Sequence, residues 1–301
     1  MRLLLITGFL GSGKTTFLKE LLAMQKGKRL SLIVNEFGRV GVDGELLLNL
    51  GASMREVVGG SIFCTCRLDQ FEEALLQAIQ ENPELILVEA SGLSDPTAIR
   101  TVLSQHPEVD YQGCVALCDA ASVEKVLSTA RVCAKQLSVS DLILLNKTDL
   151  VSAEEAARLQ LFLSKRFPLA SVQATIQGKC LPEWLDAIDA HAELVSFQDS
   201  RDITLQKAYI AVSSEMTREQ CASFVKLFVE ETYRVKGFVR LAEGWFLTDC
   251  VGAYVHMQPC ELAAGQESGL VALAGQGMNL RRSLKEAVKW YGDFIQDVRF
   301  D

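Results

Sequence analysis

Hydrophobic residues gather into short runs that end in polar or glycine residues, and helical patterns separate these runs. Five runs are rich in Leu, Ile or Val: residues 2–7, 30–35, 85–89, 114–119 and 142–146. Strands that are buried on both faces of a parallel sheet show such runs, and the intervening helices are the usual crossovers. The first two-thirds of the chain therefore predicts an α/β domain with a mainly parallel sheet flanked by helices.

The pattern changes near residues 195–202, a polar stretch without strong periodicity, where we expect the domain linker. Beyond it, the sequence predicts strands near 207–213, 235–241, 244–251, 252–258 and 269–274, and helices over 217–232 and 280–294. Helices against a mostly antiparallel sheet indicate a small α+β domain. We therefore expect two domains, residues 1–196 and 203–301, which suits a chain of 301 residues at about 150 residues per domain.

The composition is that of a globular protein and argues against several classes of partner. The 38 acidic and 30 basic side chains give a net charge of -8, whereas nucleic acids and anionic membranes favour a basic face. No apolar run approaches the roughly 18 residues of a spanning helix, and neither end reads as a targeting signal, so we expect a cytoplasmic protein without a membrane or nucleic-acid partner. Nine irregularly spaced cysteines indicate reduced thiols, and the seven outside any tight cluster fit small buried hydrophobes.

A phosphate-binding loop follows the first apolar run. Residues 8–15, Gly-Phe-Leu-Gly-Ser-Gly-Lys-Thr, fit the pattern G-x-x-x-x-G-K-[ST] directly before the amphipathic pattern of residues 16–24. The glycines let successive backbone N–H groups turn inward around an anion, and the helix N-terminus adds its positive dipole end. Lys14 is expected to reach the outer phosphates and Thr15 to bind Mg2+. We assign nucleotide binding here to Gly8, Gly11, Ser12, Gly13, Lys14, Thr15 and Thr16.

The run 142–146 ends in Asn146-Lys147-Thr148-Asp149, which fits N-K-x-D and predicts selection of guanine. The carboxylate of Asp149 can accept hydrogen bonds from the ring N–H and the exocyclic amine of guanine. Adenine presents the opposite polarity, and a buried carboxylate left unpaired would be costly. Asn146 is expected to support the loop, and the stem of Lys147 to cover the base.

The run 85–89 ends in Glu89, the expected acidic partner of Mg2+. Many P-loop proteins carry Asp at this place, and the longer Glu would reach the ion through a bound water. Gly92 can approach the γ-phosphate, which makes residues 91–95 a switch candidate. No motif identifies the residue that positions the attacking water, and Glu36 and Asp43 are the candidates for it.

Taken together, these segments resemble the CobW-like GTPases, relatives of the HypB and UreG metal-insertion GTPases. The matching segments are residues 6–16, 34–38, 88–96 and Gln136 through 146–150, and residues 233–237 resemble a segment of the smaller C-terminal domain of that family. The resemblance implies a P-loop GTPase fold, GTP and Mg2+ as cofactors, and a client metalloenzyme or cofactor-assembly protein as partner. It is also compatible with a homodimer linked to nucleotide binding.

The resemblance further implies a transition-metal site, because the family carries C-x-C-C shortly after its N-E-F-G segment. Here residues 61–64, Ser-Ile-Phe-Cys, occupy those positions, and a further cysteine follows at Cys66. Cys64 and Cys66 place two soft ligands on one side of an extended segment, with Glu36 as a third ligand by resemblance. This set suits exchangeable Zn2+ or Co2+ better than a permanent site with four ligands. The two cysteines also fit small residues that flank a switch loop.

We therefore expect a GTP-binding and GTP-hydrolysing protein that acts as a metallochaperone or metal-cofactor insertion factor for a client enzyme. The alternative is a GTPase that activates a corrinoid-dependent or other metalloenzyme without handling metal, which the altered C-x-C-C favours. A P-loop kinase would carry an Arg-bearing lid, and the sequence offers no obvious one. A silent GTP-binding scaffold would have no use for the intact Thr15 and Glu89 pair.

Overall fold

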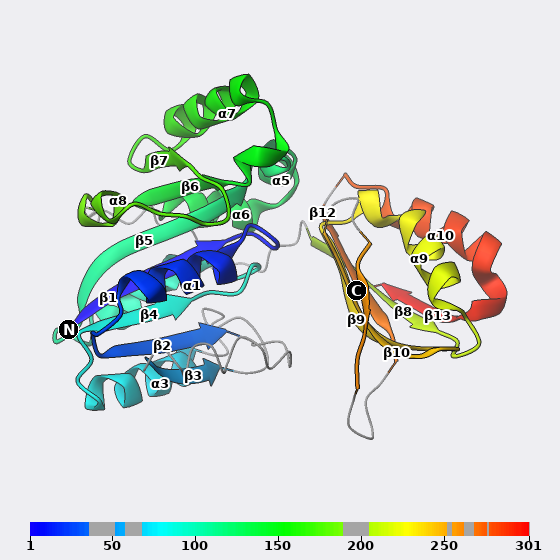
Figure 1. Ribbon diagram of the computed structural model, residues 1–301, viewed down its shortest axis with the longest axis horizontal. Coiled ribbons are helices and arrows are strands. Elements are labelled where there is room, and N and C mark those ends of the chain that lie inside the picture. The colour runs from blue at the N-terminus through cyan, green and yellow to red at the C-terminus, as the bar shows by residue number, and fades with distance from the viewer. Residues whose placement is uncertain are drawn as a thin grey trace. The chain divides into compact units, whose positions relative to one another are not determined.

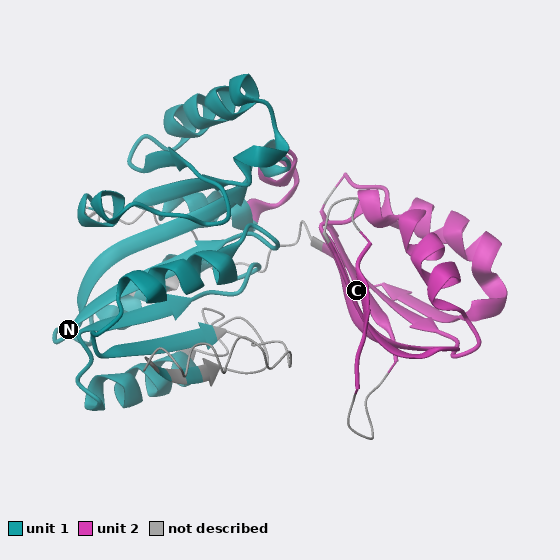
Figure 2. Ribbon diagram, in the orientation of Figure 1, with its two compact units in different colours: residues 1–124, 132–199 teal, residues 125–131, 200–301 magenta. Residues whose placement is uncertain are grey.

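The computed structural model describes residues 1–35, 52–57, 68–188, 205–251, 255–261, 268–275 and 277–300. It divides into two compact units, residues 1–124 with 132–199 and residues 125–131 with 200–301 (Figure 2). The division after residue 199 falls in the polar stretch where the sequence changes its pattern. Among the described helices, none combines the length and the apolar character that crossing a membrane requires.

A seven-stranded sheet forms the centre of the first unit, in the order β3-β2-β4-β1-β5-β6-β7 (Figure 1). Its strands are β1 (Arg2–Gly8), β2 (Leu30–Asn35), β3 (Ala52–Val57), β4 (Leu85–Glu89), β5 (Asp110–Asp119), β6 (Leu142–Asn146) and β7 (Ser171–Ala174). All neighbouring strands pair in parallel, so their carboxyl ends meet at one edge. The five predicted strands and the predicted parallel sheet are confirmed, whereas β3 and β7 were not predicted.

Helices cover both faces of this sheet. They are α1 (Lys14–Met24), α3 (Leu68–Gln80), α4 (Ile99–Leu103), α5 (Val123–Thr129), α6 (Arg131–Ser138), α7 (Ala153–Arg166) and α8 (Pro182–Asp186), with short 3-10 turns η1 (Pro96–Ala98) and η2 (Thr148–Leu150). The alternation of side chains along β1 creates the two layers. Leu3 and Leu5 pack with residues of α3 and α4, whereas Leu4 and Ile6 pack with residues of α1.

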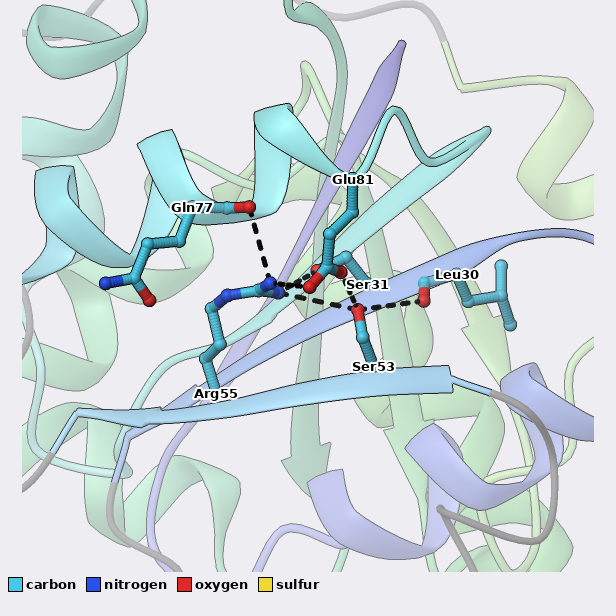
Figure 3. A network of polar contacts seen from close by, with 6 residues as sticks. All are labelled: Leu30, Ser31, Ser53, Arg55, Gln77 and Glu81. Atoms are coloured by element: carbon cyan, nitrogen blue, oxygen red, sulfur yellow. Dashed lines mark hydrogen bonds and ion pairs between the residues drawn. The ribbon is translucent and has the colours of Figure 1, made fainter.

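A polar network ties the edge strand β3 to α3 (Figure 3). The guanidinium of Arg55 donates to the Ser31 hydroxyl at 2.7 Å and to the Gln77 carbonyl at 3.3 Å, and it pairs with the Glu81 carboxylate. The Ser53 hydroxyl also donates to Glu81, and these bonds, that of Ser53 first, lower the pKa of the Glu81 carboxyl. Polar contacts thus supplement apolar packing where the strand forms the edge of the sheet.

A six-stranded sheet forms the second unit, in the order β11-β10-β9-β12-β8-β13. Its strands are β8 (Leu205–Val212), β9 (Arg234–Leu241), β10 (Gly244–Val251), β11 (Met257–Pro259), β12 (Leu270–Gly275) and β13 (Ile295–Phe300), and all neighbours pair antiparallel. Helices α9 (Arg218–Lys226) and α10 (Leu280–Tyr291) lie on the same face of this sheet (Figure 1). The predicted α+β class is confirmed, and β13 is an addition to it.

Both helices of the second unit end earlier than the sequence predicts. The capping box of Thr217 and Gln220 starts α9, which ends at Lys226, and a 3-10 turn η3 (Val229–Glu231) follows. The ring of Phe228, just beyond the helix, lies edge-on to Phe224, with centroids 5.2 Å apart. Helix α10 likewise passes into a 3-10 turn, η4 (Gly292–Phe294). The strand predicted over 252–258 is β11 in its last part, and residues 252–254 lie outside the described residues.

Candidate nucleotide-binding site

The loop between β1 and α1 has a backbone that requires glycine. Gly8, Gly11 and Gly13 have φ angles of +137°, +74° and +101°, in the left-handed region that other residues rarely adopt. Space is also short, because a Cβ on Gly8 would lie 2.3 Å from the Leu117 carbonyl oxygen. A Cβ on Gly13 would lie 2.3 Å from Nδ2 of Asn146. The loop is therefore packed against β5 and β6 and can follow its path only with glycine at these places.

Two polar side chains of this loop, those of Ser12 and Lys14, are buried. The ammonium of Lys14 donates to the carbonyls of Gly8 at 2.8 Å and Phe9 at 3.2 Å, and the residue is 9% exposed. The hydroxyl of Ser12 is buried and has no hydrogen-bond partner within the described parts of the chain. Thr15 stands exposed in the first turn of α1. A cation, an unsatisfied hydroxyl and a helix N-terminus converge here, and this donor set fits a polyphosphate.

Asn146, at the carboxyl end of β6, joins two loops. Its Nδ2 donates to the carbonyl of Ser12 at 2.9 Å, and its Oδ1 accepts the N–H of Gly178 at 3.0 Å. Gly178 has a φ of +67°, and a Cβ there would lie 2.8 Å from the backbone nitrogen of Phe17 in α1. Asn146 therefore fastens the phosphate loop to residues 175–178 behind it. This second loop was not predicted, because its signal in the sequence is just a glycine shortly after a short strand.

The other residues of N-K-x-D point in different directions. Lys147 has a φ of +61°, and its ammonium pairs with the carboxylate of Asp119 at 2.6 Å. Asp119 ends β5 next to Asn146 in the register and also accepts the N–H of Ala121 at 2.9 Å. Asp149 lies in η2 and is exposed. The Asn146 amide thus lies inside the protein, and the Lys147 ammonium points toward β5. Asp149 lies at the surface, where a nucleotide base can reach it. Asp119 is a further residue that the sequence analysis missed.

The end of β4 lies beside the phosphate loop. Glu89 pairs with Ile6 of β1 in the register and is partly exposed. Gly92 packs so closely that a Cβ would lie 2.8 Å from the backbone nitrogen of Leu10. The structure therefore brings the predicted partner of Mg2+ and the predicted switch segment to the same edge as Lys14 and Thr15.

The predicted transition-metal residues cannot be placed in the same way. Glu36, Cys64 and Cys66, like the candidate catalytic residue Asp43, lie outside the described residues, and their roles stay predictions. The described parts of the chain hold no group of three or more His, Cys, Asp or Glu residues arranged to bind a metal ion.

Of the seven other cysteines, five are buried, and Cys180 and Cys260 are half-buried. Burial raises the pKa of the Cys133 thiol to about 12, so it stays neutral at physiological pH. Neutral, buried thiols in the described residues agree with the prediction that most of these cysteines serve as small hydrophobes.

The chain is similar in sequence to known nucleotide-binding proteins. The family model described as CobW/HypB/UreG, nucleotide-binding domain, matches residues 2–172. The zinc chaperone YjiA of Escherichia coli is 33% identical over 184 residues, which are 58% of this chain and 57% of YjiA. The zinc-regulated GTPase metalloprotein activator 1 of Schizosaccharomyces pombe is 28% identical over 201 residues, 62% of this chain and 49% of that protein.

The matched part thus spans about half of each of these relatives. The crystal structure of the Zn(II)-bound YjiA GTPase from E. coli superposes with a TM-score of 0.50 at 20% identity, over 96% of this chain and 98% of that one. At this identity the likeness concerns the fold, and it extends through both units.

Proposed function

Because the chain belongs to the CobW/HypB/UreG family of nucleotide-binding domains, we propose that it binds and hydrolyses GTP with Mg2+ and uses this cycle to supply a metal to a client metalloenzyme. One observation carries the nucleotide part of this proposal. Asn146, the first residue of the predicted guanine motif, donates directly to the carbonyl of Ser12 in the phosphate loop. This hydrogen bond of 2.9 Å joins the predicted guanine motif to the predicted phosphate loop, which supports one nucleotide bound across both.

Each residue in this proposal has a role that suits its position. The backbone N–H groups of residues 8–15 and the ammonium of Lys14 bind the phosphates, in exchange for the carbonyl bonds that Lys14 makes within the loop. The exposed hydroxyl of Thr15 and the carboxylate of Glu89 hold Mg2+, which supplies charge neutralisation between the phosphates. The exposed carboxylate of Asp149 accepts the N–H groups of guanine.

The metal part of the proposal rests on the family and on three residues. YjiA is named a zinc chaperone and the S. pombe relative a metalloprotein activator. We therefore assign exchangeable binding of Zn2+ or Co2+ to Cys64, Cys66 and Glu36, with the metal as cargo for the client. The names of the relatives also suit an activator that acts through protein contacts alone, so the two parts need separate tests.

The nucleotide part is tested by equilibrium binding of fluorescent GTP, GDP and ATP analogues. Lys14→Ala should abolish binding of all three, because the phosphates lose their buried cation. Asp149→Ala should weaken the binding of GTP and GDP and should reduce the preference for GTP over ATP. Glu154→Ala, an exposed acid in the first turn of α7, is the matched control and should change nothing. Undiminished GTP affinity in Lys14→Ala would contradict the assignment.

The metal part is tested by binding of Zn2+ and Co2+ to the reduced protein, with GTP, with GDP and without nucleotide. A Cys64→Ser/Cys66→Ser variant is compared with a Cys180→Ser/Cys260→Ser control, which replaces the two half-buried thiols outside the predicted site. Affinity that needs the first pair and differs between GTP and GDP supports coupled metal handling. Metal binding that does not depend on Cys64 and Cys66 in any nucleotide state would leave activation through protein contacts as the function.

A further inference from the structure

The segment that follows β4 lies between the phosphate loop and α6. On one side, Gly92 approaches Leu10 so closely that a Cβ would stand 2.8 Å from its nitrogen and 2.9 Å from its Cα. On the other side, Nε2 of Gln136 donates to the carbonyls of Gly92 at 3.3 Å and Ser94 at 3.0 Å. Residues 91–95 therefore contact the proposed phosphate site and a buried amide at the same place.

Gln136 is a polar residue in an apolar layer. It is 0% exposed and shares the buried face of α6 with Val132, Cys133 and Leu137. An apolar side chain of the same length would pack there without needing hydrogen bonds, so the amide is explained by the two carbonyls that it holds. Its Oε1 is buried and has no hydrogen-bond partner within the described parts of the chain. Such unsatisfied acceptors are uncommon in folded proteins, and each asks for a reason.

The preceding residue of α6 holds the next part of the same segment. The ammonium of Lys135 pairs with the carboxylate of Asp95 at 2.5 Å, and that carboxylate caps η1 by accepting the N–H of Thr97 at 3.2 Å. Two successive residues of one helix thus hold residues 92–95, one by neutral hydrogen bonds and one by an ion pair.

We propose that Gln136 is a positioning residue that sets the place of the Gly92 peptide against the phosphate loop and thereby the difference in affinity between GTP and GDP. The inference rests on the proposed binding of GTP at this site. GTP differs from GDP by the γ-phosphate, the group that Gly92 is predicted to approach. Holding this peptide in place therefore favours GTP and leaves GDP nearly unaffected.

The unused acceptor of Gln136 gives the same side chain a second arrangement. When residues 91–95 shift, a backbone N–H of the segment can pair with Oε1 while a carbonyl is released. One amide then stabilises two positions of the segment, and a ligand that contacts only one of them shifts the balance. An apolar residue at this position would support neither arrangement by hydrogen bonds.

The test compares Gln136→Met, which keeps the side-chain length and removes both donors, with Gln160→Met as the matched control. Nε2 of Gln160, on α7, donates instead to the carbonyl of Val172 at 2.7 Å. Affinities for a non-hydrolysable GTP analogue and for GDP are measured on the full chain. Gln136→Met should weaken the GTP analogue by about tenfold, within the range of known couplings, and GDP by less than about twofold. The control should leave both affinities unchanged.

Two outcomes overturn the inference: equal weakening of both nucleotides, which marks a merely structural residue, and no weakening of either. A wild-type chain that binds neither nucleotide overturns the proposed function instead. Hydrogen exchange of the wild-type chain gives a readout that needs no variant. Amides of residues 91–95 should exchange more slowly with the GTP analogue than with GDP, and equal rates would contradict the proposal. If Gln136→Met does not fold, Lys135→Met is tested in its place and should weaken binding of the GTP analogue but not of GDP. Unchanged affinities of Lys135→Met for both nucleotides would count against the inference.

Discussion

Truncating Asn146 to alanine tests how the site is built, since this side chain joins the phosphate loop to residues 175–178 by two hydrogen bonds. Asn146→Ala removes the bond to the Ser12 carbonyl and the bond from the Gly178 N–H, at 2.9 Å and 3.0 Å. Asn146 is 2% exposed, so both backbone groups would stay buried without a partner. Each broken bond of this kind costs about 1–3 kcal/mol, so with two bonds lost we expect the first unit to lose about 2–6 kcal/mol. That is a large part of the stability of an ordinary domain.

The loss can be measured on the first unit alone. Of the three tryptophans, Trp184 lies in that unit, and Trp245 and Trp290 lie in the second, where they can be replaced by Phe. The fluorescence of Trp184 during urea unfolding should show a lower midpoint for Asn146→Ala with an unchanged slope. Gln206→Ala, which breaks an amide-to-carbonyl bond of 3.2 Å in the second unit, should leave this transition where it is.

An Asn146→Asp variant separates the two bonds. The Asp carboxylate can still accept the Gly178 N–H, but its other oxygen faces the Ser12 carbonyl, and two acceptors repel each other. The contact with the phosphate loop should therefore be lost while the contact with Gly178 is kept. We expect weaker nucleotide binding together with a stability loss similar to that of Asn146→Ala. A stability loss below about 0.5 kcal/mol in both variants, the size of an ordinary surface substitution, would refute the reasoning.

Gly178→Ala should destabilise the first unit more than Gly27→Ala does in thermal unfolding. Both glycines have a positive φ, of +67° and +93°, but of the two only Gly178 would bring an added Cβ against nearby backbone. Equal losses of stability would contradict this close contact. The free energy of unfolding, measured in urea, should fall from about pH 9 toward pH 12. The folded state keeps the Cys133 proton up to a pKa of about 12, whereas the unfolded state already releases it above about pH 9. Cys133→Ala should make this fall less steep. Arg55→Met should speed hydrogen exchange in β3, because it removes the pair with the exposed Glu81, worth at most about 1 kcal/mol. Unchanged exchange rates would show that the pair is dispensable.

The central strands could be predicted because burial on both faces leaves them apolar throughout. Strands β1, β2, β4, β5 and β6 appear in the sequence as continuous runs of Leu, Ile and Val. The two strands that the sequence analysis missed lie at the edges of the same sheet. β3 reads Ala-Ser-Met-Arg-Glu-Val and β7 has four residues, so neither shows a long apolar run or a clear alternation. An edge strand buries less of its surface, and its pattern is correspondingly weak.

The candidate site was predictable as far as backbone chemistry imposes a motif. Gly8, Gly13 and Lys14 carry a pattern because the loop tolerates only glycine at its turns and needs a cation inside. Asp119 and Gly178 have no such pattern, since they act through contacts that form only when β5, β6 and β7 lie side by side. Such contacts depend on the order of the strands, which the run of residues along the chain does not reveal.

Asn146 and Gln136 show how neutral amides brace a phosphate site from inside the protein. An amide buries at less cost than a charge and offers both donors and an acceptor, so one side chain can hold two backbone groups. Asn146 uses its donor on one loop and its acceptor on another, so the two loops can separate only when one of these bonds breaks. Gln136 uses donors only and holds one segment from one side. The Gly178 N–H should therefore resist hydrogen exchange equally with GTP and GDP, whereas residues 91–95 should respond to the nucleotide. Exchange that changes at Gly178 and stays constant at 91–95 would reverse this assignment of the fixed and the moving loop.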